Sequence, residues 1–365
     1  MVDNGNHLIL SANENFLELC KLLKSENTLV RYNSKFNFFD YKEKKKWSLE
    51  LPKTAMPLWI FNKKKRIPNT KVKDYFEILK FILMNKNHTV QDLFSKNNNL
   101  YKKLWEPLTL GILNTECKNA SAYLLWNVLK KTFLRGGKYC QIYQPIVNWS
   151  DSLINPALDF LKENKSKINY NNLLKKIEVE ENRVKKLIFQ KNELTINDTE
   201  KVIIAIPPSN IMRFLPELKL PKDYNTIINI HFKYKYFTKI KETPIFGLIN
   251  SKSHWVFTKN NYISVTISAA NDLNSLDSEL LIKSVWDEVT ECLGIKDEIL
   301  PEYKILKEKK ATYNQSPKNN NLIKNIKNLP TNLFLAGDWT ESSFPSTIES
   351  SILSGKNALN RCYNF

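Results

Sequence analysis

The sequence predicts an α/β protein with additional α+β elements, built from two interleaved domains. A chain of 365 residues with 42% hydrophobic content is long enough to bury two cores. Near its end, the apolar run 333–336 is followed by Gly337 and then by a helical pattern, which is typical of a buried strand, a tight turn and a helix. A second apolar run, 202–206, ends at a Pro-Pro pair, as a buried strand does. We therefore expect parallel strands covered on both faces.

The other elements follow from hydrophobic periodicity. Strands are predicted where apolar residues alternate or run together, at 2–10, 227–236, 254–258 and 263–268, with a hairpin at 173–179 and 183–189. Helices are predicted where apolar residues recur every three or four positions, at 13–23, 72–84, 90–94, 100–113, 121–133, 153–163 and 278–293. No repeat and no long low-complexity linker separates these segments, so the two domains are expected to exchange chain several times.

The turn after the last strand predicts a ligand site. Ser346 and Glu349 have the spacing of a capping box, which would leave the N–H groups of Thr347 and Ile348 pointing out of the helix. The carboxylate of Asp338 lies at the end of the strand beside them. An acceptor next to free helix amides suits a ligand that carries sugar hydroxyls and an anionic ring or phosphate.

Seven segments of the chain resemble the motifs of one family, in the same order. They are DNGNH at 3–7, WEPL at 105–108, LNT at 113–115, IAIPP at 204–208, HWVF at 254–257, EKKAT at 308–312 and AGDWTESSFPSTIESSILSG at 336–355. These resemble the squalene-associated FAD-dependent desaturases, also called hydroxysqualene dehydroxylases, within the flavin amine oxidase and phytoene desaturase superfamily. The resemblance covers nearly the whole chain.

The resemblance implies an FAD-binding amine-oxidase-like fold with an interleaved substrate domain. The FAD-binding domain would comprise residues 1–20, 137–210 and 305–365, and the substrate domain with its helical cap residues 21–136 and 211–304. The implied activity is that of an FAD-dependent oxidoreductase that transfers a hydride between flavin N5 and a carbon of a polyisoprenoid. Hydroxysqualene dehydroxylation to squalene and a related desaturation both fit.

The resemblance also implies the cofactor residues. Asp338 would accept hydrogen bonds from the ribitol, the amides of Thr347 and Ile348 would face the flavin ring, and the backbone of Leu174 would meet the adenine. The full set is Asp3, Asn4, Gly5, His7, Leu174, Gly337, Asp338, Trp339, Thr347 and Ile348. Three positions depart from the family pattern: Ser343 and Ser350 replace glycines, and Asn6 replaces a glutamine.

A polyisoprenoid offers little polarity, so its pocket is expected to be apolar and aromatic. The candidate residues are Trp105, Asn114, Phe246, Trp255, Phe257 and Lys309. Each of the aromatic residues also fits a packed core, and Lys309 also fits an exposed surface. No catalytic base or nucleophile is nominated. The four histidines lack the spacing of metal ligands, so no metal site is predicted.

The superfamily opens with a strand, a GxGxxG turn and a helix that hold the FAD pyrophosphate. None of the eight glycines of this chain has that spacing, and Met1-Val2 stands directly before the DNG segment. We therefore expect this chain to need a separate N-terminal GxGxxG segment. Two interpretations stay open: an enzyme that this segment completes, and a non-catalytic or decayed derivative that binds a lipid surface or a partner.

The net charge of +18 comes almost entirely from lysine, since only six of the 55 basic residues are arginines. A nucleic-acid-binding protein would use arginine for phosphate and base contacts, so no nucleic-acid partner is expected. The basic clusters Lys42–Lys46 and Lys63–Arg66 flank the apolar segment Pro57–Phe61. They fit either a solvated surface or a patch that rests on anionic lipid. Five unclustered cysteines and the lack of a signal peptide predict a cytoplasmic protein. If the basic clusters rest on anionic lipid, the protein would be peripheral on the inner membrane.

Overall fold

The computed structural model describes residues 3–236, 243–259, 261–296 and 299–363. Its largest sheet has the strand order β14-β10-β13-β12-β11-β3-β4. The strands are β3 (Lys35–Asp40), β4 (Lys45–Glu50), β10 (Tyr224–Phe232), β11 (Ile245–Ile249), β12 (Trp255–Thr258), β13 (Ile263–Ile267) and β14 (Tyr303–Tyr313). All neighbours are antiparallel except β3 and β11, which are parallel.

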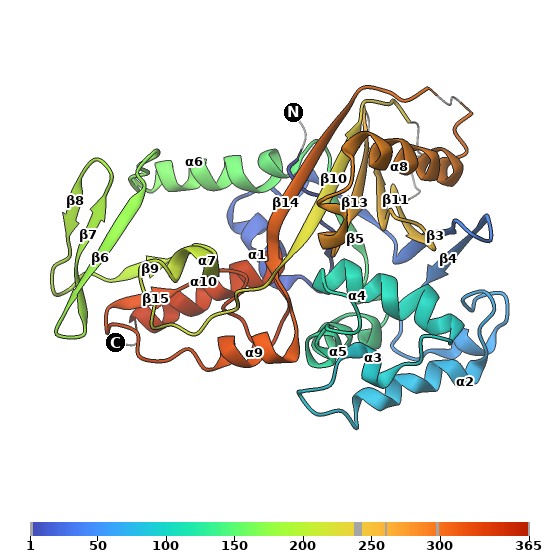
Figure 1. Cartoon of the computed structure of the whole chain (residues 1–365), viewed down its shortest axis with the longest axis horizontal. Coiled ribbons are helices and arrows are strands. Elements are labelled where there is room, and N and C mark those ends of the chain that lie inside the picture. Colours follow the sequence, from blue (N-terminus) through green and yellow to red (C-terminus); the bar gives the residue numbers. More distant parts are fainter. Residues whose placement is uncertain (1–2, 237–242, 260, 297–298, 364–365) are drawn as a thin grey trace.

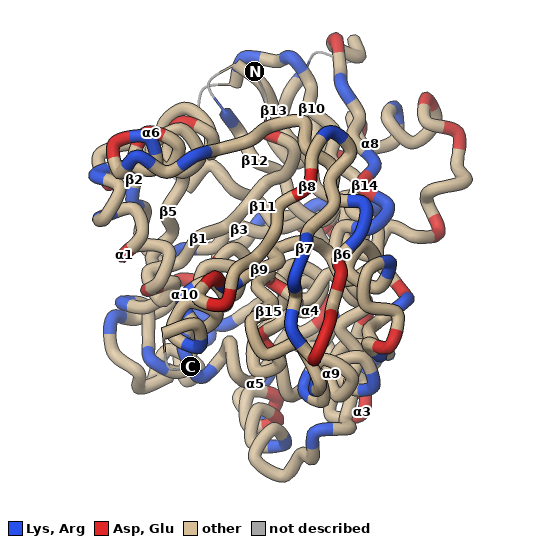
Figure 2. The backbone as a smooth tube through the Cα atoms, turned by 90° about the vertical axis from the view of Figure 1, so that its left-hand side faces the viewer, with Lys and Arg blue, Asp and Glu red and all other residues tan. Residues whose placement is uncertain are grey.

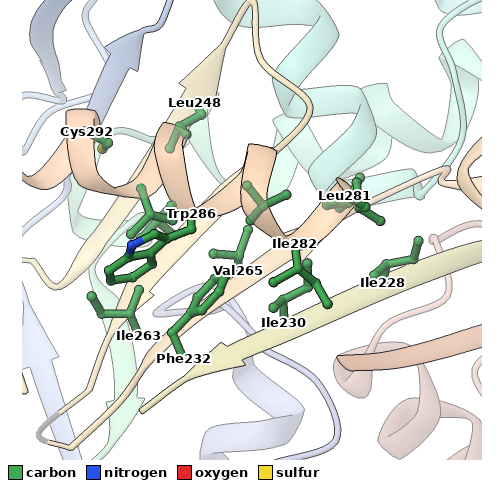
Figure 3. Close-up of a cluster of buried hydrophobic side chains, with 14 of the residues drawn as sticks. Ile228, Ile230, Phe232, Leu248, Ile263, Val265, Leu281, Ile282, Trp286 and Cys292 are labelled. Atoms are coloured by element: carbon green, nitrogen blue, oxygen red, sulfur yellow. The ribbon is translucent and has the colours of Figure 1, made fainter. Parts of the chain in front are cut away.

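Helix α8 (Ser278–Leu293) covers one face of this sheet (Figure 1). Because side chains alternate along a strand, Ile228, Ile230 and Phe232 of β10 all point toward α8, where Phe232 packs against Trp286 with ring centroids 4.9 Å apart (Figure 3). These four side chains are at most 2% exposed. The opposite face therefore carries the intervening residues of each strand, and it is this face that matters for the candidate site.

A helical region lies beside the sheet. It contains α2 (Val72–Tyr75), which continues as a 3₁₀ segment to Phe81, then α3 (Val90–Leu93), a π-helical turn (Tyr101–Trp105), α4 (Glu106–Leu113) and α5 (Ala122–Lys131). Its core contains Phe81, Phe94 and Trp105. The buried Lys103 joins this region to the sheet through ion pairs with Asp40 and Glu43, with N···O distances of 3.4 and 3.0 Å.

The remaining elements form smaller sheets with their helices. A three-stranded sheet joins β1 (Ile9–Leu10), β5 (Ile142–Pro145) and β2 (Leu29–Tyr32), with α1 (Glu14–Leu22) and α6 (Asn155–Glu163) nearby. Strands β9 (Val202–Ile204) and β15 (Leu333–Leu335) pair in parallel. They are accompanied by the antiparallel strands β6 (Leu174–Glu180), β7 (Arg183–Phe189) and β8 (Glu193–Thr195), and by α7 (Pro208–Ile211), α9 (Pro317–Lys324) and α10 (Ile348–Tyr363). Figure 2 views the end that carries β6, β7 and β8, where basic and acidic stretches lie side by side.

The structure confirms the predicted helices at 13–23, 121–133 and 278–293, the hairpin at 173–189 and the strands β12 and β13. The predicted strand at 2–10 is wrong in the part that the structure describes, because only Ile9 and Leu10 pair as a strand. Several elements were not predicted at all, namely β2, β3, β4, β5, β8, β11, β14 and α9. Strand β14 pairs with β10, so residues 305–313 lie in the same sheet as the strands β10, β11, β12 and β13.

Candidate functional site

The carboxyl ends of the parallel strands β9 and β15 meet the start of α10. Gly337 has a φ of +139°, and its N–H donates to Ser354 Oγ of α10 at 2.8 Å. A Cβ at Gly337 would lie 2.7 Å from Trp339 Nε1, so only glycine fits between the strand and the indole. Glycine thus lets the backbone turn tightly while Trp339 stays packed beneath it.

Trp339 joins the two strand ends. Its indole is 2% exposed, and Nε1 donates to the carbonyl oxygen of Ile206 at 2.9 Å. Asp338 lies between Gly337 and this anchor, in a partly buried position where desolvation raises the pKa of its carboxyl. The sequence prediction that Asp338 stands at the strand end is confirmed by the end of β15 at Leu335.

The start of α10 differs from the predicted capping box. The helix begins at Ile348, and Thr347 Oγ1 accepts from the N–H of Ser350 at 3.2 Å, so Thr347 rather than Ser346 caps it. Glu349 instead receives hydrogen bonds from the N–H and side-chain amide of Asn15 and from the N–H of Phe16, at 3.1, 2.7 and 2.9 Å. The first turn of α1 offers this carboxylate three donors, which a capping box would not.

Several polar groups at this corner have no partner among the described residues. The N–H groups of Thr347 and Ile348 have no acceptor there, and Tyr313 OH and Ser346 Oγ are buried without one. Burial raises the pKa of Tyr313, and the charge of Asp338 raises it further. The two unpaired N–H groups beside a desolvated carboxylate, whose pKa the Ser346 side chain lowers in part, fit a ligand that brings both acceptors and hydroxyl donors.

The Asp3–His7 segment lies against the sheet face opposite α8 and is held by side chains. Asn6 Nδ2 donates to Ser264 Oγ at 2.7 Å and to Thr266 Oγ1 at 2.9 Å, and Asn229 Nδ2 donates to the carbonyl oxygen of Asn4 at 3.2 Å. Two further bonds fix its ends. Asp3 Oδ1 accepts from the N–H of Trp149 at 3.0 Å, and the carbonyl oxygen of His7 accepts from Gln144 Nε2 at 2.8 Å. These side-chain bonds replace the strand pairing that alternation predicted.

The partners of this segment form a polar row on β10 and β13, composed of Asn229, His231, Ser264 and Thr266. Asn229 pairs in register with Thr266, and His231 with Ser264. Ser264 Oγ lies 2.8 Å from His231 Nδ1, and burial lowers the pKa of His231 to about 4, so the imidazole is neutral. Sequence reasoning missed this row. Its signal was polar residues at alternate positions of two otherwise apolar strands, 227–232 and 263–267.

Two of the predicted pocket aromatics continue the polar row. Trp255 and Phe257 of β12 stand opposite Thr266 and Ser264 in the register of β13, so they share its face. The other two do not join them. Phe246 packs with the α8 core on the opposite face, and Trp105 is 3% exposed within the helical core, stacked on Phe94 with ring centroids 4.6 Å apart.

The three remaining candidates, Asn114, Leu174 and Lys309, lie in a helix cap, in a packed cluster and on the exposed surface, respectively. Asn114 caps α4 in the left-handed conformation, where its side chain accepts from the N–H of Ala269 at 2.6 Å and donates to Thr312 Oγ1 at 3.0 Å. Leu174 opens β6 and packs with the cluster that contains Trp339. Lys309 is exposed on β14.

Comparisons with known proteins show what the whole chain is similar to. The family model described as flavin containing amine oxidoreductase matches residues 1–362. The chain is 34% identical to the hydroxysqualene dehydroxylase of Zymomonas mobilis over 98% of its own length and 86% of that protein. It is 31% identical to the hydroxysqualene dehydroxylase of Sinorhizobium fredii, with 98% and 85% covered. Among solved structures, cyclohexylamine oxidase from Brevibacterium oxydans superposes with a TM-score of 0.70 at 12% identity, covering 100% of this chain and 88% of the oxidase.

Proposed function

Because this chain belongs to the flavin containing amine oxidoreductase family and is therefore an FAD-dependent oxidoreductase, we propose that its substrate is a polyisoprenoid. The proposed reaction is the dehydroxylation of hydroxysqualene to squalene, or a related desaturation. The observation that carries this proposal is the 34% identity to a hydroxysqualene dehydroxylase over nearly the full chain. The alternative, a non-catalytic derivative of such an enzyme, is an outcome of the test below.

The residues at the end of β15 fit a flavin. Asp338 would accept from sugar hydroxyls, and the unpaired N–H groups of Thr347 and Ile348 would donate to the ring, where negative charge develops on reduction. Gly337 allows close approach of the backbone, and Leu174 belongs to the cluster under Trp339. When bound, the flavin supplies a hydride for the substrate carbon that loses its hydroxyl group.

The face that carries the polar row would position the substrate. Trp255 is partly exposed and offers aromatic surface of the kind that a polyisoprenoid chain contacts, whereas Phe257 is 5% exposed and belongs to a packed core. The neutral His231 avoids an uncompensated charge beside the substrate chain. The polar row also holds the Asp3–His7 segment in place through Asn6 and the carbonyl of Asn4. Held in this way, the segment would help to exclude water from a substrate on this face.

A glycine-rich strand–turn–helix segment is proposed as the partner that completes the FAD site. Strand β15 pairs with β9 and with no other strand among the described residues. Ile203 of β9, on the face toward α10, remains 43% exposed. Parallel strands are normally covered on both faces, so an open edge and an exposed isoleucine favour a further strand and helix at this place.

The substrate class is tested by anaerobic single turnover. The protein completed with its glycine-rich segment is loaded with FAD, reduced by dithionite and mixed with hydroxysqualene. We expect the oxidised flavin absorbance to return as one squalene forms per flavin, because the hydride that replaces the hydroxyl group carries both electrons of one reduced flavin, and the hydroxyl group leaves as water with a proton. Cyclohexylamine, added to the oxidised protein as a control, should leave the flavin oxidised. Bound flavin that stays reduced with hydroxysqualene would favour the non-catalytic alternative.

A further inference from the structure

The helical region carries an exposed apolar surface at the end of the molecule far from β6, β7 and β8 (Figure 1). We name it the apolar ridge, and its members are Met56, Leu58, Phe61, Phe76, Leu79, Ile82 and Leu83. Every member is at least half exposed, from 52% for Leu79 to 85% for Leu83. Large apolar side chains gathered in this way mark an interaction surface, whereas single exposed ones do not.

The ridge is continuous because two short segments pack together. The 3₁₀ turn Leu58–Phe61 lies against α2, where the rings of Trp59 and Tyr75 meet edge to face with centroids 5.3 Å apart. From α2 the chain continues as a 3₁₀ segment, in which Phe76, Leu79 and Ile82 recur every three residues and so share one face. The opposite face of the same segment carries Phe81, which is 1% exposed in the helical core.

Lysines surround the ridge. Residues 51–86 contain eight lysines and one arginine but only two acidic residues. Lys63, Lys64 and Lys65 follow the first ridge segment directly and are all exposed. Both acids are already engaged, since Asp74 accepts from the N–H of Lys71 and Glu77 pairs with Lys80 at 3.4 Å. The net charge of this surface is therefore strongly positive.

We infer that the apolar ridge and its lysines dock on the surface of an anionic lipid bilayer. Exposed apolar side chains with many lysines in the same segments match the boundary between acyl chains and acidic headgroups. A second copy of the chain would bring like charges together at this surface, so the bilayer fits better. No helix in the described ranges is both long and apolar enough to cross a membrane, so contact through this surface would be peripheral.

The structure favours one of the two basic clusters as the one that would contact lipid. Of the two clusters that the sequence offered, Lys63–Arg66 adjoins the ridge, whereas Lys44 of the other cluster is engaged in an ion pair with Glu291 and lies over the ring of Tyr41. Docking would let a water-insoluble substrate enter directly from the lipid. The entry of substrate from the lipid rests on the proposed function, but the binding of the protein to lipid does not.

The test is co-sedimentation of the 365-residue chain with vesicles of phosphatidylcholine alone or mixed with phosphatidylglycerol. We expect binding only to the anionic vesicles, and a steep fall between 0.01 and 0.1 M salt, over which the Debye length shrinks from about 30 to about 10 Å. Changing Lys63, Lys64 and Lys65 to Gln should weaken binding on the order of 100-fold, since each lysine near an anionic surface contributes about 1 kcal/mol, which is roughly fivefold in affinity.

Matched controls separate this surface from overall charge and hydrophobicity. Changing Lys162, Lys165 and Lys167 to Gln removes the same charge from the distant α6 end and should leave binding within twofold (Figure 1). Leu79→Ser with Leu83→Ser should abolish binding, whereas Leu280→Ser, at a 70% exposed site on α8, should not. Equal binding to neutral and anionic vesicles, no binding to either, or a dimer that the Leu79 and Leu83 changes dissociate without altering vesicle binding would each overturn the inference. None of these measurements requires flavin or substrate.

Discussion

The 365-residue chain purified by itself is expected to be nearly colourless, and the same chain joined to a strand–GxGxxG–helix segment is expected to be yellow with stoichiometric FAD. The reason is the pyrophosphate, for which the chain has no glycine-rich turn. Hydrogen bonds to a charged group contribute about 1.5 to 3 kcal/mol each, so losing two or three weakens FAD by roughly 3 to 9 kcal/mol. This corresponds to about two to six orders of magnitude in affinity.

Flavin absorbance per protein after gel filtration measures this difference. The control is the joined protein with its GxGxxG glycines changed to valine, which should lose the colour while keeping the added length. Stoichiometric flavin in the unaided chain would show that the cofactor is held without a pyrophosphate turn.

Gly337→Ala is expected to destabilise the protein by about 2 to 6 kcal/mol. A φ of +139° costs a non-glycine residue about 1 to 3 kcal/mol, and the new methyl group would lie 2.7 Å from Trp339 Nε1. Moving the indole breaks its bond to Ile206 and leaves a buried donor unpaired, which adds about 1 to 3 kcal/mol. The whole folding free energy of a domain is only about 5 to 15 kcal/mol.

Urea unfolding followed by tryptophan fluorescence measures this change. Gly355→Ala is the matched control, because the same substitution in the middle of α10 meets nothing within 4 Å. There alanine should stabilise the helix by up to about 1 kcal/mol. If both variants unfolded at the parent midpoint, the packing of Trp339 beneath the strand turn would be wrong.

Local patterns were sufficient to predict the end of β15, the turn at Gly337 and the helix that follows. All the determinants of these elements lie within a few residues of one another, so periodicity and turn chemistry reveal them. The predicted capping box of Ser346 and Glu349 was wrong because the partners of Glu349 are distant in the sequence. Glu349 bonds Asn15 and Phe16, which are more than 300 residues away along the chain, and no local pattern reports such a competitor.

Of the seven-stranded sheet, the sequence predicted only β10, β12 and β13, because the other strands depend on pairing between distant segments. Strand β3 pairs in parallel with β11, about 200 residues later, and β14 pairs with β10 over a long register with an irregularity after Asn225. Strand pairing between distant segments leaves a weak local signal when exposed lysines interrupt the alternation, as they do in β14. The polar row was missed because its function depends on Asn6, which reaches it from the other end of the chain.

The sequence also could not predict which apolar side chains of the segment 72–84 are exposed to solvent. The pattern at 72–84 predicts a helix with apolar residues, and such residues are normally buried. In the structure Phe81 enters the core, but Leu79 and Leu83 point to solvent, because the helical core is already filled by Phe94 and Trp105. Only the packed fold distinguishes a core-facing stripe from the apolar ridge.

Asp338→Ala tests most directly whether the flavin lies at the corner between β15 and α10. The measurement is an FAD titration of the completed protein, followed by flavin fluorescence, for the parent, Asp338→Ala and the control Asp198→Ala. The control removes the same charge from an exposed aspartate. We expect Asp338→Ala to weaken FAD by about 1.5 to 3 kcal/mol, roughly 10- to 150-fold, and the control to match the parent. Parent-like FAD affinity in a folded Asp338→Ala protein would contradict the assignment.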